Sequence, residues 1–460
     1  MLERQVFERM VTGEEKRRAC NLEGMKGVTI LEYPTLRHGR RMRVLACNVY
    51  AELTQKNGVL TIKYQDRVET IKDDPHDYLK NWFNHQGEGS QLPFSGGAIG
   101  YIGYSYSLQF ENLNVPEEDV LDMNDLHLLL HSDYFIFSGE DLEDCQQIYV
   151  QYGSPISDGE AEGRMKIALE QATLRKRAED AYSIGLLRSN HTKASFLEAV
   201  DSIKSHIRQG DIFQAVLSQR WSGAFQGDSL AYFSKLKEQH PSSFSFYLPF
   251  EEYEVLGCSP ERLLAVESGI IHSNPIAGTR RRGATVGEDE QLVQELLSDE
   301  KEKAEHLMLV DLARNDLGKI CRKESIKLHR FMEIEKYKNV IHLVSDISGT
   351  MAAGSHTIDA VKACLPAGTV SGAPKIRAME LISIYEQEKR GAYGGGIGYL
   401  SFDGNIDLAL AIRMAVVKNG RIHQQSGAGI VHDSNPENEW YETLHKAGLK
   451  EVSLNDFTYR

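Results

Sequence analysis

The sequence predicts an α+β fold built on large antiparallel sheets. Apolar runs separated by short polar turns predict strands between residues 27 and 65. From residue 193 onward, segments with helical spacing alternate with strand-like segments. Near the C-terminus, the strand-like stretches within 397–432 are joined by the short turns DGN and KNG, which connect antiparallel neighbours.

The chain is long enough, at 460 residues, for one large intertwined domain or for two to three ordinary ones. We expect a β-rich N-terminal region over 1–190 and a second unit over 191–460. A linker is predicted at 176–192, because polar residues punctuate the sequence there after a helical run. Alternating glycine and aromatic residues predict a strand at 92–107 whose backbone closely approaches its neighbours.

In the second unit, a helix over 192–210 with a Thr start and a Gly stop is followed by a strand at 212–221. A helix is also predicted at 299–316. The segment 434–448 has both ends of a helix: Ser434 or Asn435 as the cap, Pro436 in the first turn and Gly448 at the stop.

A strand at 406–417 has a distinctive alternation. Its apolar face, which includes Leu408 and Leu410, should lie in the core. The other face carries small or charged residues and should leave a space into which Arg413 projects: Asp407, Ala409, Ala411, Arg413 and Ala415.

The composition excludes several partners. Against 52 basic residues there are 66 acidic ones, and the net charge of -14 disfavours nucleic acid or an anionic membrane as a general partner. No segment has the apolar length of a membrane span, and the charged N-terminus does not resemble a signal peptide, so we expect a cytoplasmic protein. The cysteines lack C-x-x-C spacing and should be buried free thiols: Cys20, Cys47, Cys145, Cys258, Cys321 and Cys364.

Two predicted helices carry glutamates three residues apart on one face, Glu302 with Glu305 and Glu439 with Glu442. Half-buried carboxylates repel one another and are costly to desolvate unless a cation neutralises them. Mg²⁺ would suit them, because it binds through one or two carboxylates together with an anionic substrate. Charged helix faces are usually solvated, so from the spacing alone Glu305 would more often reach solvent or form an ion pair with Lys301 or Arg314.

Seven segments together resemble the chorismate-utilising enzymes: DIFQAVLSQR, GCSPERL, PIAGTRRRG, DEKEKAEHLMLVDLARND, LPAGTVSGAPKIRAMEL, YGGGIGYLSFDGNIDLALAIR and QSGAGIVHDSNPENEWYETLHKAG. The resemblance covers nearly all of 193–460 in the same order, but before residue 190 mainly PFSGGAIGYIGY. It implies an α/β sandwich of two large antiparallel sheets with the site between them. It also implies Mg²⁺ held by Glu305 and Glu442, with Glu302 and Glu439 in the outer shell.

The resemblance implies that one carboxylate of chorismate lies on the metal, and that the enolpyruvyl carboxylate meets Tyr393, Arg413 and the backbone amides of Gly427 and Gly429. The residues assigned to substrate are Tyr393, Arg413, Gly427, Ala428, Gly429, Gly278 and Thr279. A guanidinium can bind a carboxylate through two hydrogen bonds, and the small residues of SGAG let backbone N–H groups approach an anion. Taken alone, these glycines would more often mark a turn or bulge.

The implied reaction aminates the ring with loss of its hydroxyl and then eliminates pyruvate. Glu261 matches the general acid and must be held protonated. His342 would position the substrate or remove the ring proton, although a histidine on an apolar strand is more often a core residue. Thr369 would donate a hydrogen bond to substrate, and Lys446 would balance charge. Gln214 stands where the isochorismate and salicylate synthases have a water-activating lysine, which favours ammonia as the nucleophile.

Within the family, two positions favour the large subunits of the anthranilate synthases. The aminodeoxychorismate synthases of the folate branch, which remain the alternative, typically have PIKGT and PGGSITGAPK, whereas this chain has Ala277 and Ala367. The usual tryptophan-binding motifs LLES and PSPYMYY read ILEY and PSSFSFY here, with Tyr33 and Ser245 at the changed positions, which argues against tryptophan inhibition.

The sequence shows no fused glutaminase, because no glycine-flanked cysteine occurs with its histidine signature. The resemblance therefore implies a separate glutaminase subunit that supplies ammonia, in a heterodimer or heterotetramer. By analogy, the N-terminal half would be its docking surface.

Overall fold

The computed structural model describes residues 4–36, 41–83, 93–111, 113, 115–116, 118–174, 181–337 and 340–449. The helices are α1 Gly13–Asn21, α2 Pro75–Trp82, α3 Tyr104–Leu108, α4 Asp158–Thr173, α5 Lys193–Arg208, α6 Ser229–Gln239, α7 Val286–Ser298, α8 Glu300–Gly318, α9 Thr357–Cys364, α10 Lys375–Tyr385 and α11 Pro436–Lys446, with short 3-10 turns η1 Leu22–Gly24, η2 Lys323–Ser325 and η3 Gly368–Val370.

The strands lie mostly in long antiparallel pairings. They are β1 Arg4–Met10, β2 Thr29–Pro34, β3 Arg41–Lys56, β4 Val59–Tyr64, β5 Val68–Ile71, β6 Gly97–Ile102, β7 Leu126–Ser138, β8 Asp144–Tyr152, β9 Tyr182–Ile184, β10 Arg188–Ser189, β11 Gln214–Gly227, β12 Phe244–Pro249, β13 Tyr253–Ser259, β14 Arg262–Glu267, β15 Ile270–Ser273, β16 Ile276–Arg281, β17 Lys327–Lys336, β18 Val340–Thr350, β19 Gly372–Ala373, β20 Gly396–Ser401, β21 Ile406–Leu410, β22 Met414–Lys418 and β23 Arg421–Ile430.

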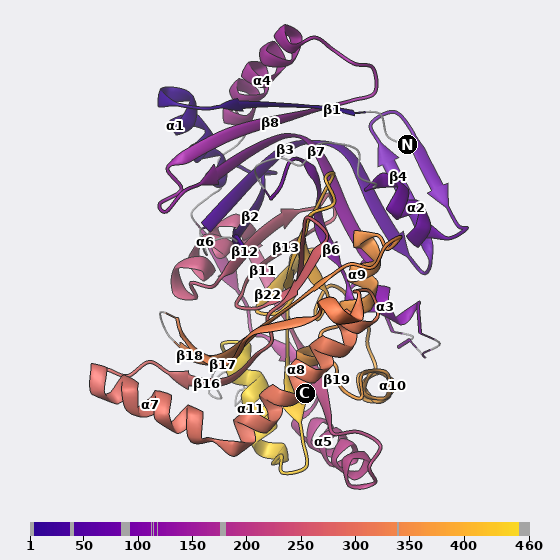
Figure 1. Ribbon diagram of the computed structural model, residues 1–460, viewed down its shortest axis with the longest axis vertical. Helices are drawn as coiled ribbons and strands as arrows, with labels where there is room; N and C mark the ends of the chain where they lie inside the picture. The colour runs from indigo at the N-terminus through magenta and orange to yellow at the C-terminus, as the bar shows by residue number, and fades with distance from the viewer. Residues whose placement is uncertain are drawn as a thin grey trace.

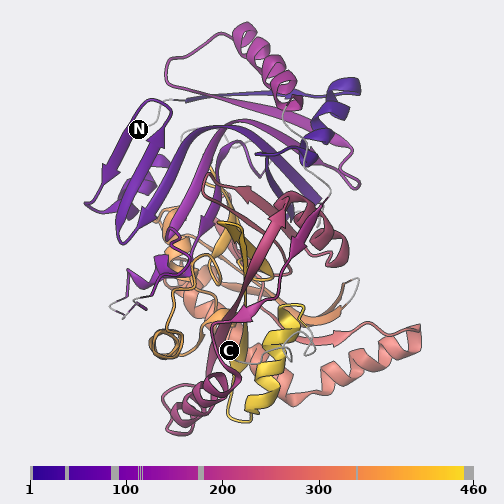
Figure 2. The ribbon, with the colours of Figure 1, turned by 180° about the vertical axis from the view of Figure 1, so that it is seen from behind.

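Two arms of sheet diverge from the long pair β3 and β7. The first arm runs β2, β12, β13, β22, β23 and β11, each strand antiparallel to the next. The second arm runs β6, β20, β21, β14, β15 and β18, and β16 and β17 also pair with β18. This confirms the α+β fold with large antiparallel sheets. Figures 1 and 2 show β3, β7 and β8 at one end of the molecule and α5, α7 and α11 toward the other.

The N-terminal region is woven into both arms. Strand β2 pairs with β12, and β6 pairs with β20, so strands from before residue 190 complete sheets made mostly of later strands. The apolar core follows the same pattern, since its largest cluster includes both Val44 and Leu408. The boundary near residue 190 stays a prediction, and the sheets continue across it.

The predicted linker is wrong where the structure describes it. Residues 176–180 lie outside the described residues, but β9 and β10 both pair with β11. The predicted strand at 92–107, whose first residue is not described, is the shorter β6 followed by α3. Its close backbone approach is confirmed, because a Cβ on Gly100 would lie 2.0 Å from the carbonyl oxygen of His127.

The three helix predictions of the second unit are confirmed, and so are the caps predicted for α5 and α11. The side chain of Thr192 accepts a hydrogen bond from the backbone of Ser195 at the start of α5. Asp299 caps α8, and Asn435 rather than Ser434 caps α11. The cysteines are free, but Cys20 is exposed, so the expectation of buried thiols is wrong at that position. None of the described helices has the length and apolarity that crossing a membrane requires.

The single strand predicted at 406–417 is wrong. The chain forms β21 in the second arm, crosses over, and continues as β22 in the first arm. Arg413, at the crossover, has a left-handed φ of 52°. The predicted alternation therefore ends at Leu410. Even within β21 it does not distinguish a buried face from a face that lines an open space, because Leu408 and Ala409 are both buried. Asp407 is also buried, in an ion pair with Arg262 at 2.9 Å.

Candidate active site

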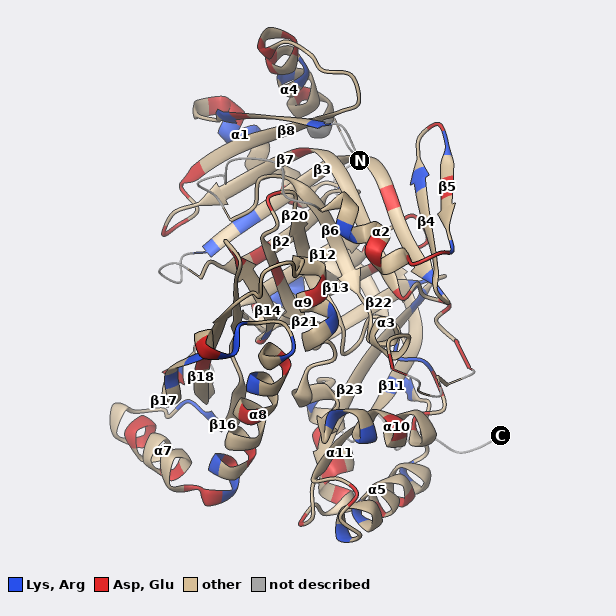
Figure 3. Ribbon diagram, turned by 45° about the vertical axis from the view of Figure 1, so that its right-hand side comes forward, with Lys and Arg blue, Asp and Glu red and all other residues tan. Residues whose placement is uncertain are grey.

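A cavity of about 540 Å³ lies where the two arms face each other. Helix α8 lies to one side of this part of the molecule and α11 to the other (Figure 3). Of the predicted site residues, all but one line the cavity: Gln214, Glu261, Gly278, Thr279, Glu302, Glu305, His342, Thr369, Tyr393, Arg413, Gly427, Gly429, Glu439, Glu442 and Lys446.

Ala428 is the exception, and its prediction is wrong. It belongs to a regular antiparallel strand, β23, in which successive side chains point to opposite faces. Gly427 and Gly429 line the cavity, whereas Ala428 is fully buried in the apolar core behind the strand. The regular pairing with β11 also excludes the turn or bulge that the glycines alone would indicate.

The four glutamates lie in one cavity, as the family resemblance implies, with Glu302 and Glu305 on α8 and the other two on α11. Burial raises the pKa of Glu305, and the charge of Glu302 raises it further. Burial likewise raises the pKa of Glu439, and the charge of Glu442 adds to this effect. The cavity wall therefore has an excess of negative charge that disfavours ionised carboxylates.

Two of these glutamates, Glu302 and Glu442, form ion pairs. Glu302 pairs with Arg280 at 3.1 Å, and Glu442 pairs with Lys446 at 2.6 Å. Glu305 accepts a hydrogen bond from the amide nitrogen of Gln214 at 3.3 Å and forms no ion pair within the described part of the chain. The alternative of a pair with Arg314 is not observed, since that arginine contacts Asp311 at 3.5 Å.

These carboxylates fit a hard divalent cation. The described residues contain no group of three or more His, Cys, Asp or Glu side chains close enough to hold a metal. Mg²⁺ needs fewer protein ligands, because it binds through one or two carboxylates plus substrate oxygens and water. Burial is the main cause of the raised pKa values of Glu305 and Glu439, and the charges of Glu302 and Glu442 add to them; a cation between the helices would offset this repulsion between carboxylates.

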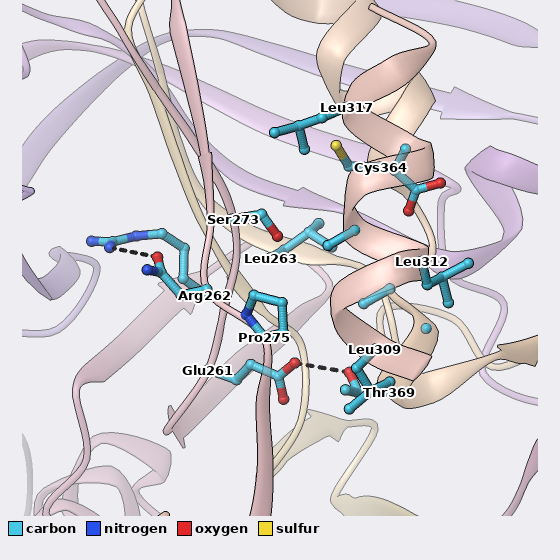
Figure 4. A pocket seen from close by; sticks show the side chains of 15 residues that line it. Glu261, Arg262, Leu263, Ser273, Pro275, Leu309, Leu312, Leu317, Cys364 and Thr369 are labelled. Carbon is cyan, nitrogen blue, oxygen red and sulfur yellow. Dashed lines mark hydrogen bonds between the residues drawn. The ribbon is translucent and has the colours of Figure 1, made fainter. Parts of the chain in front are cut away.

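Glu261 lies between β13 and β14, where burial favours its protonated form. The hydroxyl of Thr369 donates to its Oε1 at 2.8 Å (Figure 4). Burial raises the pKa of Glu261 to about 7, although Thr369 and the charge of Lys446 lower it. Both side chains also border a smaller cavity of about 40 Å³ whose walls include Leu263 and Leu312 (Figure 4). This largely apolar surrounding makes the charged carboxylate costly.

His342 also lines the cavity and is held in one orientation. Its Nδ1 lies 2.9 Å from the carbonyl oxygen of Gly278 and 3.2 Å from the hydroxyl of Thr279. Because a carbonyl can only accept, Nδ1 carries the proton and Nε2 is left as an acceptor. Burial lowers the pKa of His342, so the ring is neutral at neutral pH. Gly278 forms a bulge with a φ of +66°, which brings its carbonyl to the ring.

The cationic groups gather around the end of α11. Arg413 is exposed to the cavity, yet the surrounding protein lowers its pKa, and its Nη1 donates to the carbonyl oxygen of Lys446 at 3.0 Å. The ammonium of Lys446 donates to the carbonyl oxygen of Gly427 at 3.0 Å. Burial raises the pKa of Tyr393 to about 12, so its hydroxyl remains a donor. These groups form an anion-binding wall opposite the glutamates of α8.

Two features of the site were missed by sequence reasoning. Gln425 lines the cavity, and its position two residues before Gly427 on the same strand face could have identified it. Gly429 has a second use, because a Cβ there would lie 2.7 Å from the amide nitrogen of Gln214. Glycine therefore leaves room for Gln214 to reach Glu305.

A cavity that combines a partly protonated carboxyl, a neutral histidine and an anion-binding wall suits an enzyme acting on a small anionic molecule. The family model described as chorismate binding enzyme matches residues 30–449, and the chain belongs to that family.

Named relatives resemble the chain over nearly its whole length. This chain is 40 % identical over 441 residues to anthranilate synthase component 1 of Lactococcus lactis, and the match covers 94 % of this chain and 95 % of the relative. Component I of the anthranilate synthase of Streptococcus pneumoniae superposes with a TM-score of 0.79 at 38 % identity, covering 90 % of this chain and 92 % of that one. The menaquinone-specific isochorismate synthase of Escherichia coli shares the fold, with a TM-score of 0.73 at 18 % identity over 97 % and 94 % of the two chains.

Proposed function

We propose that this chain is the aminating large subunit of an anthranilate synthase, which converts chorismate and ammonia to anthranilate and pyruvate. The observation that carries the proposal is the 40 % identity to a component 1 relative over 94 % of the chain. The cavity supports it, because the groups needed for amination and elimination all line it.

In the first step, ammonia attacks the ring and the ring hydroxyl departs. Glu261 donates the proton that lets the hydroxyl leave as water, which its pKa of about 7 permits. Gln214 lines the same cavity but cannot act as a base, so it would not activate water as a competing nucleophile.

In the second step, pyruvate is eliminated and the ring becomes aromatic. The unprotonated Nε2 of His342 is suited to accept the ring proton, because its Nδ1 is committed to Gly278. Arg413 and Tyr393 bind the enolpyruvyl carboxylate by charge and hydrogen bonds, and Lys446 balances charge in the cavity.

We propose Mg²⁺ as the cofactor, with Glu305 and Glu442 as ligands and Glu302 and Glu439 orienting its waters. Bound there, the ion would neutralise the other substrate carboxylate and the charge that develops as the hydroxyl leaves. To bind it, Glu442 would have to exchange its present partner, Lys446, for the metal.

We also propose a separate glutaminase subunit as the ammonia source and the cytoplasm as the location. The test incubates the purified chain with chorismate, Mg²⁺ and ammonium and identifies the product by chromatography and fluorescence. Equal amounts of anthranilate and pyruvate are expected, and glutamine should replace ammonium only when a glutaminase subunit is added. Accumulation of aminodeoxychorismate instead would reject the ortho assignment and favour the folate-branch alternative.

A further inference from the structure

A buried ion pair lies beside the cavity but outside its lining. Arg390 and Glu386, which follow α10, are only 3 % and 4 % exposed. The Nε and Nη2 of Arg390 donate to the two carboxylate oxygens of Glu386, both at 2.6 Å. This two-bond geometry fixes the plane of the guanidinium.

Two further hydrogen bonds join Arg390 to backbone next to two residues of the site. Its Nη1 donates to the carbonyl oxygen of Val370 at 2.7 Å, directly after Thr369. Its Nη2 donates to the carbonyl oxygen of Val216 at 2.9 Å, two residues after Gln214 on the same strand face. One guanidinium therefore joins η3 to β11.

Two aromatic rings lie near the guanidinium of Arg390, and strand β11 donates hydrogen bonds to Glu386. The guanidinium lies 4.5 Å from the ring of Tyr104 in α3 and 5.6 Å from the ring of Tyr393. Glu386 also accepts hydrogen bonds from the backbone N–H and the hydroxyl of Ser218 on β11, at 2.6 and 2.8 Å. Arg390 thus contacts the N-terminal region and three segments that bear site residues.

We propose that Arg390, oriented by Glu386, is a positioning residue for the reaction. It holds Gln214, Thr369 and Tyr393 at fixed separations around the substrate, although it lines the cavity with none of its own atoms. A buried ion pair is a weak device for stability, because desolvating both charges offsets most of their attraction. A fully hydrogen-bonded polar network does, however, restrict the groups that it joins to one arrangement. The inference rests on the proposed function for the identity of the substrate.

The first experiment compares Arg390→Lys with the control Arg43→Lys, which makes the same exchange in an ion pair with Glu32 outside the cavity lining. Lysine keeps the charge of Arg390 but cannot make its two-bond contact with Glu386 while also reaching both carbonyls. We expect kcat to fall about 10- to 100-fold, the cost of a small misplacement of reacting groups. The control should keep kcat unchanged. Equal effects of the two variants on kcat would overturn the proposal.

The second experiment is a double-mutant cycle with Thr369→Val. If Arg390 acts through the η3 turn, Arg390→Lys lowers kcat several-fold less in the Thr369→Val background than in the unmodified chain. Additive losses would show a structural role alone and overturn the proposal. Should Arg390→Lys fail to fold, Glu386→Gln, which keeps the side-chain size, carries the same cycle.

Both experiments are scored by consumption of chorismate, whatever product forms. The product made by the unmodified chain tests the proposed function. The double-mutant cycle tests whether Arg390 positions the residues that line the cavity. The two inferences can therefore fail separately.

Discussion

Replacing Glu261 with glutamine should abolish most activity and yet stabilise the protein above pH 7. Burial raises the pKa of this carboxyl from an ordinary value of 4.5 to about 7 in the folded chain. Because the folded pKa of this acid lies above the unfolded one, burying its charge destabilises the fold. The penalty is absent below about pH 4.5, grows as the pH rises through that window, and is complete above pH 7.

The size of the penalty follows from the two pKa values. At 1.36 kcal/mol per pKa unit, the difference between 4.5 and about 7 corresponds to about 3 kcal/mol. This is an upper limit, because the cavity admits water. Glutamine keeps the shape of the side chain and can still accept the hydrogen bond of Thr369 without carrying a charge.

The assay measures the free energy of unfolding of Glu261→Gln and of the unmodified chain by denaturant titration at about pH 5 and pH 8. The variant should be more stable at the higher pH, with a much smaller difference at the lower pH, and kcat should fall about 10²- to 10⁴-fold. The same stability difference at both pH values would refute the raised pKa. An unchanged kcat would refute the acid role.

Three further outcomes are expected. Mg²⁺ should raise the Tm of the unmodified chain, chelation should reverse the rise, and Glu305→Gln should weaken it; an equal rise in the variant would exclude Glu305 as a ligand. Gly278→Ala should cost at least about 1–2 kcal/mol in denaturant titration, because alanine disfavours a positive φ and its Cβ would lie 2.8 Å from Leu296; unchanged stability would contradict this. Tryptophan should neither inhibit the enzyme nor bind in calorimetry, because Tyr33 stands where the tryptophan-binding motif has serine. Its buried ring has its centroid 5.2 Å from that of Tyr399, and tryptophan binding would contradict this prediction.

The sequence predicted best what depends on short-range spacing. The caps of α5 and α11 and the glutamate pairs follow from helical periodicity and capping chemistry, which act over a few residues. The common location of the site residues came from the family resemblance, because no local pattern brings Glu305 and Glu442 into one cavity.

The wrong predictions arose where buried surface hides the strand period. Both faces of β21 are buried, so the alternation of leucine and alanine could not reveal the crossover at Arg413. Ala428 was included because its neighbours are glycines, although the period of two in β23 turns it away from the cavity. Arg390 escaped notice because its partners are backbone carbonyls from distant segments, which leave no mark in the local sequence.

The weaving of β2 and β6 into the two arms affects how this enzyme can be divided or rebuilt. Without these strands, β12 and β20 would each have an open edge whose N–H and C=O groups could recruit other chains. A chimera that replaces the region before residue 190 with that of a relative would therefore have to match the strand edges of both β12 and β20. This shared backbone pairing means that the two regions fold as one unit.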